Sequence, residues 1–443
     1  MLTEGRITPT LVRFSIPLIL TAFLQQLYNV VDTAIVGRCI SVDALSAVGL
    51  TGSLTFLVLG VIIGCAVGFC IQLAQSFGAG DESAFGAYLW NGLYLTVALG
   101  LVVTVLTVPL RHVLLRLLNT PEELYQMAEA YLLIILSGSV VTAFYNYVAG
   151  ILRATGDSKH PLVFLLISSV LNLMLDLLFI LVFHMGVRGA ALATVLSQIF
   201  SGALCLDRAV RKARLVKRRA GGVSVTGLHV AKCKTLLASG LPMGLNYSIT
   251  AIGNVVLQGS INRLGTVAVA AQTTGEKIRQ MLTMPVENIG AAANTFVAQN
   301  YGAGRLDRVK GGLKSALIVS IVYDALAFVL LFFGKRAAVS AVLGADTGAE
   351  AEGAVYYLGV ISTLFVFHAV LIIFRNFLQG LGFAFIAMMS AAGEILGRVL
   401  GGLLAVRLDS FLLICLANPF AWIIAGAFLV FVTPRLYRRI SGR

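Results

Sequence analysis

Four polar side chains in otherwise apolar stretches have the types and spacing to bind a proton or a small cation. Asp32 lies in the run QQLYNVVDTAIVG, and Asn172 and Asp176 lie one helical turn apart in NLMLD. Thr194 adds a hydroxyl from a third apolar stretch. Burial and a second carboxylate both favour the protonated form of an aspartate, so such a pair can bind and release a proton near neutral pH. The same oxygens also suit Na⁺, and the residues alone do not choose between the two ions.

Three further polar residues precede Asp32 on the same apolar segment. Gln25 and Asp32 are seven residues apart and share one helical face, with Tyr28 or Asn29 between them. We expect Gln25, Tyr28 and Asn29 to line a substrate cavity. Counted from the outer ends of the predicted spans, Asp32, Asp176 and Thr194 lie at similar depth, so three helices can bring them to one point.

Charged residues also fall in apolar stretches of the second half of the chain. A charge at the centre of a bilayer costs about 2.5–3.5 kcal/mol on insertion scales, so each of these needs a reason. Glu394 and Arg398 are one turn apart, which favours mutual neutralisation, with Arg375 as a third member. Three residues have no obvious partner and either line a cavity or pack in the interior: Glu287, Asp324 and His368.

The amino-acid composition indicates that these residues lie on membrane-spanning helices. Hydrophobic residues make up 58% of the 443-residue chain and charged residues 12%, about half the charged fraction of a soluble domain. Several charge-free runs exceed the ~20 residues that span a bilayer as a helix. They lack the alternation of a membrane β-barrel. We therefore predict an all-α integral membrane protein in contact with lipid.

The net charge of +13 does not indicate a nucleic-acid partner, because the basic residues sit in short connections where membrane topology explains them. The six cysteines are scattered without metal-ligand spacing, and we expect no cofactor or resident metal beyond a coupling ion. We predict twelve spans, roughly over residues 11–37, 44–75, 85–110, 128–152, 160–184, 187–206, 235–262, 266–300, 312–334, 354–379, 382–406 and 410–434.

The basic residues also set the orientation and the division of the chain. If the N-terminus is cytoplasmic, 21 of the 33 Lys and Arg residues face the cytoplasm and eight face the opposite side. This bias places both termini in the cytoplasm. A basic linker, 207–234, separates an N-terminal six-helix lobe, 1–206, from a C-terminal six-helix lobe, 235–443.

An internal repeat supports this division. AQSFGAG (74–80) and AQNYGAG (298–304) each end a predicted span, and each Gly-Ala-Gly should end its helix in a tight turn. Pro17 and Pro242 occupy equivalent places, and either can permit a helix kink that acts as a hinge. Six spans per half is an even number, so the halves should be parallel repeats about an axis along the membrane normal. Two such bundles are typical of a transporter.

The chain resembles the multidrug and toxic compound extrusion (MATE) family over essentially its whole length. The resemblance implies two six-helix lobes arranged as a V, and cation-driven antiport by alternation between outward-open and inward-open states. The motifs that carry it, in this order, are IPLILTAFLQQLYNVVDTAIVGR (16–38), LAQSFGAG (73–80), GILRATGDSKHP (150–161), GVRGAALAT (186–194), GLPMGL (240–245) and FVAQNYGAGR (296–305).

Within the family, the chain is most similar to the DinF-like prokaryotic branch. That branch couples transport through an Asp, an Asn–Asp pair one turn apart and a Thr in its N-terminal lobe. Asp32, Asn172, Asp176 and Thr194 match those positions, and Gln25 matches a Gln that lines the same lobe. The NorM-like branch adds acids on spans 7 and 10, where this chain has none.

The resemblance implies a monomeric secondary transporter of a bacterial inner membrane that exports amphipathic, often cationic organic compounds. Asp32 would be the principal coupling residue and Asp176 its electrostatic partner. The nearest alternative is a flippase for lipids or lipid-linked oligosaccharides, which typically needs a basic cavity. A membrane enzyme is disfavoured, because the sequence shows no Asp-rich motif for Mg²⁺ and no paired nucleophile and base.

Overall fold

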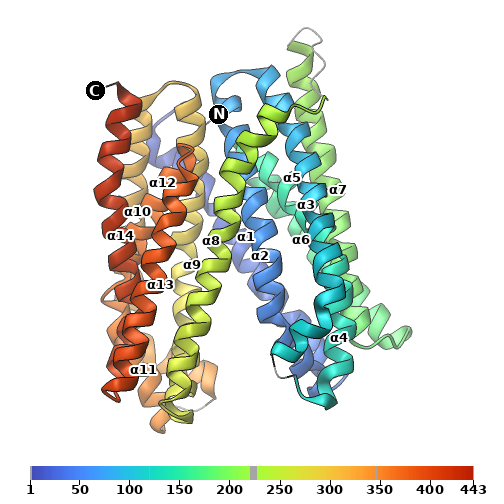
Figure 1. Ribbon diagram of the computed structural model, residues 1–443, viewed down its shortest axis with the longest axis vertical. Helices are drawn as coiled ribbons and strands as arrows, with labels where there is room; N and C mark the ends of the chain where they lie inside the picture. Colours follow the sequence, from blue (N-terminus) through green and yellow to red (C-terminus); the bar gives the residue numbers. More distant parts are fainter. Residues whose placement is uncertain (1, 119, 220–226, 345–346, 443) are drawn as a thin grey trace. The chain divides into compact units, whose positions relative to one another are not determined.

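The computed structural model describes residues 2–118, 120–219, 227–344 and 347–442, and the regular elements in these ranges are all helices (Figure 1). The first half contains α1 (Ile7–Cys39), α2 (Val42–Ala79), α3 (Glu82–Leu117), α4 (Glu122–Ser137), α5 (Ser139–Ala154), α6 (Lys159–Leu177), the π-helix η1 (Leu178–Val182) and α7 (Val187–Arg219). The second half contains α8 (Val230–Asn262), α9 (Thr266–Gly302), α10 (Leu306–Leu343), α11 (Ala349–Ser362), α12 (Phe365–Gly380), α13 (Ala384–Arg407) and α14 (Phe411–Ser441).

These helices occupy all twelve predicted spans, which confirms the all-α membrane fold. Eight helices in the described ranges are long and apolar enough to cross a membrane, and two bent pairs, α4 with α5 and α11 with α12, bring the number to ten. The two predicted spans not included in this count are α8 and α9, of 33 and 37 residues. Polar residues interrupt their apolar sequence.

Two spans that the sequence predicts as continuous helices are broken. The chain bends by 47° between α4 and α5 and by 55° between α11 and α12. At the first bend Gly138 packs closely on α7, because a Cβ at this position would lie 2.6 Å from Cγ2 of Val195. A side chain would force the bend away from α7, so the glycine permits this packing.

The chain forms two compact units. Unit 1 comprises residues 16–248, and unit 2 comprises residues 2–15 and 249–443. This division differs from the predicted lobes, 1–206 and 235–443, because the starts of α1 and α8 each pack with the other half of the chain. The basic segment 207–234 also differs from a simple linker: α7 continues to Arg219 and α8 begins at Val230, while residues 220–226 lie outside the described ranges.

Hydrogen bonds explain why the N-terminal segment belongs to unit 2. Arg305 donates from Nη1 to the Thr3 carbonyl at 2.6 Å, and Arg308 donates from Nη1 to the Gly5 carbonyl at 2.7 Å. The Leu2 N–H donates to Oε1 of Gln299 at 3.1 Å. Gln299 lies within the second copy of the repeat and Arg305 directly follows it, so this part of the chain binds the N-terminal segment.

Both copies of the repeat end a helix, as predicted. α2 is capped by Gly80, with φ of 69°, and its N–H donates to the Phe77 carbonyl. After α9, Gly304 has φ of 70° and donates to the Tyr301 carbonyl. Both glycines hold the left-handed conformation that side chains other than glycine rarely adopt, which explains the recurrence of Gly at this place.

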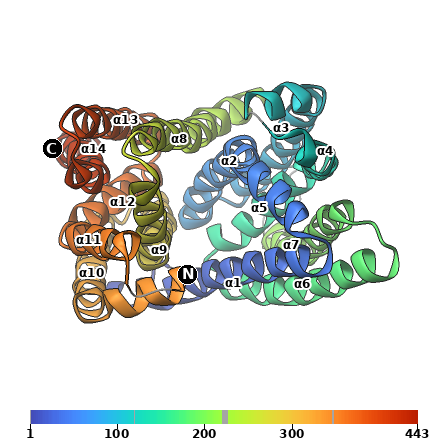
Figure 2. The same cartoon turned by 90° about the horizontal axis from the view of Figure 1, so that it is seen from below.

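In unit 1, α5 packs against α2, α3 and α7 (Figure 2). Tyr147 of α5 is fully buried and donates to the Leu89 carbonyl at 2.9 Å. The start of α8 meets α2 through small residues, since a Cβ at Gly64 would lie 2.6 Å from the Met243 carbonyl oxygen. Close backbone approach of this kind is typical of helix pairs within membranes.

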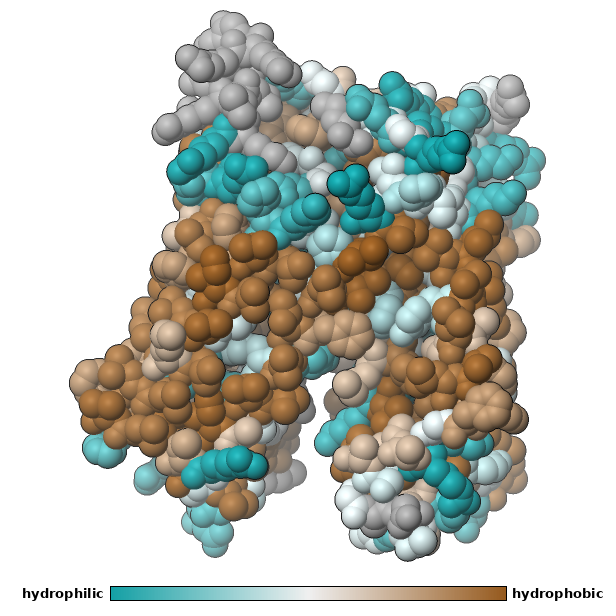
Figure 3. Space-filling model, turned by 180° about the vertical axis from the view of Figure 1, so that it is seen from behind, coloured by the Kyte–Doolittle hydropathy of each residue, from teal (hydrophilic) through white to brown (hydrophobic). Residues whose placement is uncertain are grey.

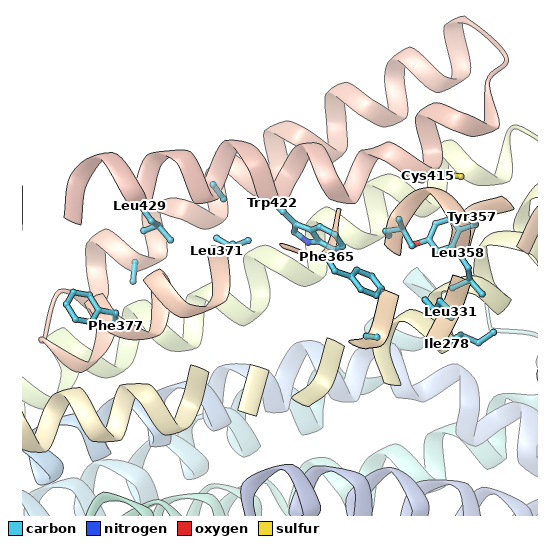
Figure 4. Close-up of a cluster of buried hydrophobic side chains, with 14 of the residues drawn as sticks. Ile278, Leu331, Tyr357, Leu358, Phe365, Leu371, Phe377, Cys415, Trp422 and Leu429 are labelled. Carbon is cyan, nitrogen blue, oxygen red and sulfur yellow. The ribbon is translucent and has the colours of Figure 1, made fainter. Parts of the chain in front are cut away.

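In unit 2, one apolar core joins α9, α10, α11, α12 and α14 (Figure 4). Tyr357, Phe365, Leu371 and Trp422 are among its fully or almost fully buried members. On the face seen in Figure 3, apolar side chains cover the middle of each unit and hydrophilic side chains gather toward the ends. Exposed apolar side chains such as Phe333, at 82%, fit lipid as the surrounding medium.

Candidate cation-binding site

Two aspartates form the centre of the candidate site in unit 1. The carboxyl groups of Asp32 on α1 and Asp176 at the end of α6 lie close enough for a hydrogen bond and for each charge to act on the other. Asp176 is fully buried, and Asp32 is partly exposed. The Oδ1 atom of each is buried without a hydrogen-bond partner in the described ranges. Each acid therefore has an oxygen free to take a proton or a cation.

The predicted partners from α6 and α7 surround this pair. Asn172 is 1% exposed, and with its amide oriented to satisfy both neighbours it donates to Oδ2 of Asp176 at 2.8 Å. In the same orientation its oxygen accepts from the Thr194 N–H at 3.2 Å. The Thr194 hydroxyl lies 3.2 Å from the Tyr28 hydroxyl. The structure thus brings Asp32, Asn172, Asp176 and Thr194 together and adds Tyr28.

The local helix geometry explains how α6 presents its two residues. Asn172 and Asp176 are one turn apart and both face the interior of unit 1. Directly after Leu177 the helix widens into the π-helix η1, a distortion that is frequent at functional sites. Among the described residues, no Lys, Arg or His acts electrostatically on Asp32 or Asp176. The two carboxyl groups therefore have no fixed countercharge.

Sequence reasoning missed one member of this site. Tyr131 on α4 lies close enough to both Asp32 and Asp176 for their charges to act on its hydroxyl. It stands in an otherwise apolar run, where a single tyrosine resembles a core residue. Only the packing of α4 reveals its position.

Other polar residues of α1 lie on a different face of the helix from Asp32. Gln25 and Asn29 are exposed, as is Thr33 one turn further along. Tyr28 and Asp32 turn toward α6 and α7 instead. Of the two residues that the spacing left open between Gln25 and Asp32, Tyr28 joins the acids, and Asn29 shares an open polar face with Gln25.

The two prolines lie inside the helices that belong to both units. Pro17 interrupts α1 one residue after the boundary between residues 15 and 16. Pro242 interrupts α8 ahead of the boundary between residues 248 and 249. A proline removes one backbone hydrogen bond and weakens the helix locally. Their role as hinges stays a prediction.

Unit 2 contains a different kind of polar cluster. Glu394 on α13 bonds Arg375 on α12 through Oε1 and Arg398 through Oε2, the latter at 3.1 Å. Arg398 also donates from Nε to Asn418 at 3.0 Å, and Arg375 donates from Nε to Ser390 at 3.2 Å. These contacts confirm the predicted neutralisation of Glu394 and Arg398, with Arg375 as the third member.

A second ion pair in unit 2 was missed. Glu276 and Arg279 on α9 make a two-pronged contact, with nitrogen–oxygen distances of 2.8 and 2.5 Å. Tyr357 donates to Glu276 at 2.8 Å, and the Arg279 guanidinium lies 5.6 Å from the ring centroid of Trp422. The available signal was the spacing of three residues between opposite charges on one helix.

The three residues without a predicted partner lie in different surroundings. His368 on α12 is buried, and its Nε2 lies 3.9 Å from Oε1 of Glu287 on α9. The Glu287 side chain is 56% exposed. Asp324 on α10 is 4% exposed, and neither carboxylate oxygen has a hydrogen-bond partner in the described ranges. Glu287 is thus open, whereas Asp324 is packed inside.

Comparison with known proteins identifies the family. The MatE family model matches twice, over residues 17–178 and 242–402, more than half of the chain in total. The chain belongs to the MatE family. The two matches begin at Pro17 and at Pro242, so the family pattern occurs twice in this chain, at the two places that the internal repeat indicated. Its family is one of membrane transporters rather than enzymes. The DinF-like branch within the family stays a prediction.

Relatives and solved structures agree with the family. The chain is 30% identical to "Probable multidrug resistance protein YpnP" of Bacillus subtilis, over 69% of this chain and 68% of that one. It is 29% identical to "Probable multidrug resistance protein NorM" of Thermotoga maritima, over 73% and 69% of the two chains. A structure described as the outward-facing conformation of a multidrug resistance MATE family transporter superposes with a TM-score of 0.88 at 22% identity, covering 100% of this chain and 97% of the other.

Proposed function

We propose that this MatE-family protein exports amphipathic, often cationic organic compounds in exchange for H⁺ or Na⁺, by alternating access. It works as a monomer in a bacterial inner membrane, with both termini in the cytoplasm. Two relatives are named as multidrug resistance proteins, which supports the class of compound. The ion-coupling site is Asp32 with Asn172, Asp176 and Thr194.

One observation carries this proposal: two carboxyl groups meet inside the membrane-spanning part of unit 1, and no basic residue in the described part of the chain neutralises them. Two charges of the same sign in a medium of low dielectric repel strongly. The pair is therefore stable only when it takes up a positive charge, either as a proton on one carboxyl or as a Na⁺ ion. Binding and release of that ion therefore change the relative free energies of the outward-open and inward-open conformations, as an exchanger requires.

The partners of the pair suit both ions. With a proton bound, the protonated carboxyl donates to the other, while Asn172 continues to donate to Oδ2 of Asp176. With Na⁺ bound, the free Oδ1 atoms of Asp32 and Asp176 and the Thr194 hydroxyl offer oxygen ligands. Loading the site pulls α1 toward α6, and unloading lets the two carboxylates repel. α1 carries Pro17 and packs in both units, so its movement would reach both.

The alternative function, a flippase for lipid-linked anions, has less support from the side-chain contacts. Such a protein needs free basic groups to hold a pyrophosphate. Of the four basic residues that lie away from the ends of the predicted spans of unit 2, the three arginines are already bonded to glutamates: Arg279 to Glu276, and Arg375 and Arg398 to Glu394. The fourth, Lys277, is a single exposed side chain on α9. In unit 1, the acidic pair would repel an anionic head group.

The test is transport by the purified protein reconstituted into vesicles loaded with ethidium, a fluorescent organic cation. A pH gradient or a Na⁺ gradient is imposed, and efflux is followed for the wild type, Asp32→Asn and Asp43→Asn. Asp43 is an exposed acid in the first turn of α2 and is the matched control. We expect one of the two gradients to drive efflux in the wild type and in Asp43→Asn, and Asp32→Asn to abolish it.

The gradient that works identifies the ion. Full gradient-driven efflux by a folded Asp32→Asn protein would contradict the assigned coupling site. Efflux that neither gradient accelerates would contradict exchange itself.

A further inference from the structure

We propose that Glu287 is the residue with which unit 2 binds the positively charged group of an exported compound. The inference rests on the proposed export function and names a second place, apart from the acidic pair of unit 1, where charge is recognised. It follows from the exposed face of α9, from the charges around Glu287, and from the packing behind it.

The exposed face of α9 carries more polar than apolar side chains. From residue 273 onward its exposed residues are Thr273, Lys277, Gln280, Met281, Glu287 and Ala291. The neighbouring helix α10 exposes an apolar face instead, which includes Leu326, Leu330 and Phe333. A lipid-facing stripe with a carboxylate near the middle of a 37-residue helix would be strongly unfavourable. The stripe of α9 therefore faces water.

Apart from Lys277 on the stripe itself, six charged side chains gather here in unit 2, three basic and three acidic. Arg375 and Arg398 share Glu394, and Arg279 pairs with Glu276. The paired groups alone carry one net positive charge, and Glu287 brings the sum to zero. None of the other five side chains exceeds 21% exposure, whereas Glu287 is 56% exposed.

The charges on every side of Glu287 can be named. Arg279 and Glu276 act on it from its own helix, Arg375 from α12 and Glu394 from α13. His368 approaches it from α12, with Nε2 at 3.9 Å from Oε1. No arginine forms a salt bridge with Glu287 among the described residues. Its carboxyl group therefore lies within electrostatic range of two arginines without being paired to either.

The packing behind Glu287 is closed. His368 is 4% exposed, and its ring lies 5.1 Å from that of Trp422 in an edge-to-face arrangement. Trp422 lies in the apolar core of unit 2 (Figure 4) and is 3% exposed. The Nδ1 atom of His368 is buried without a hydrogen-bond partner in the described ranges. One side of the carboxylate therefore faces buried aromatic side chains, and the other is exposed and can contact a ligand.

This arrangement selects by the sign of the charge. A cationic group beside Glu287 is attracted to its carboxylate, and the low dielectric of the packed protein behind the carboxylate strengthens this attraction relative to bulk water. An anionic group meets the same carboxylate and gains nothing from the arginines, which are bonded already. Gln280 and Asn288 supply uncharged hydrogen-bonding groups on the same helix, while the apolar part of a compound contacts the apolar side chains nearby.

The experiment compares two probes of nearly equal size and shape but opposite charge, tetraphenylphosphonium and tetraphenylborate. Equilibrium dialysis in detergent measures the binding of each to the wild type, Glu287→Gln, Glu287→Asp and Glu123→Gln. Glu123 is an exposed acid at the start of α4, so its change to Gln is the matched control. We expect Glu287→Gln to weaken tetraphenylphosphonium binding by about tenfold without weakening tetraphenylborate binding.

Glu287→Asp keeps the charge and should keep most of the preference for the cation, and Glu123→Gln should behave as the wild type. An unchanged preference for the cation in folded Glu287→Gln would overturn this inference. The export function would still stand if Asp32→Asn abolished gradient-driven efflux. If the wild type bound no tetraphenylphosphonium, both this inference and the cationic substrate class would be contradicted.

Discussion

Units 1 and 2 match the same family model yet treat charge inside the membrane in opposite ways. In unit 1, Asp32 and Asp176 face each other with no basic residue acting on them among the described residues. In unit 2, Glu394 lies between Arg375 and Arg398, and all three are buried. The first arrangement is stable only with a bound positive ion, whereas the second supplies its own. The acidic pair of unit 1 can therefore respond to the binding and release of an ion, whereas the ion pairs of Glu394 stabilise the packing of unit 2.

We expect the largest loss of stability from a substitution in the Glu394 ion pairs of unit 2. Glu394→Gln would leave Arg375 and Arg398 buried without their countercharge. Removal of one partner from a buried ion pair typically destabilises a protein by about 3–5 kcal/mol. We expect a large fall in the thermal unfolding temperature of the purified protein, or failure to obtain folded protein. A Glu394→Gln protein as stable as the wild type would show that the triad does not hold α12 and α13 together.

A substitution in the acidic pair of unit 1 should not lower stability, in contrast to Glu394→Gln. Asp176→Asn removes one of two repelling buried carboxyl groups, and its amide can still accept from Asn172. Stability should stay unchanged or rise by up to about 1 kcal/mol, while gradient-driven efflux is lost. The measurement pairs thermal unfolding with vesicle efflux on the same preparation. A marked loss of stability would mean that Asp176 is a structural residue like Glu394.

Much of the unit 1 site could be predicted because it depends on spacing and depth. Asn172 and Asp176 are one turn apart on any helix, and counting along each span brings Asp32 and Thr194 to the same level. Tyr131 could not be found this way, because its position depends on the bend between α4 and α5. That bend arises where Gly138 packs on α7, a contact between segments distant in sequence.

In unit 2, likewise, some contacts could be predicted from the sequence and others could not. Glu394 and Arg398 lie on one helix, so their pairing could be read from the sequence. The proximity of Glu287 and His368 could not, because it depends on how α9 packs against α12. Likewise, nothing in residues 2–5 indicates that their backbone would be held by Arg305 and Arg308. Local geometry is encoded in spacing, whereas contacts between helices require the packed structure.

The smallest effect is predicted for an ion pair that resembles the buried triad but lies at the surface. Arg336 donates to both carboxylate oxygens of Glu352, at 2.9 and 3.2 Å, and the two side chains are 63% and 56% exposed. Water already solvates these charges, so Glu352→Gln should change the free energy of unfolding by only about 0–1 kcal/mol. It is the same chemical change as Glu394→Gln, which makes it the matched control. A similar loss of stability in both variants would show that burial does not separate them, because exposure is what distinguishes the two ion pairs.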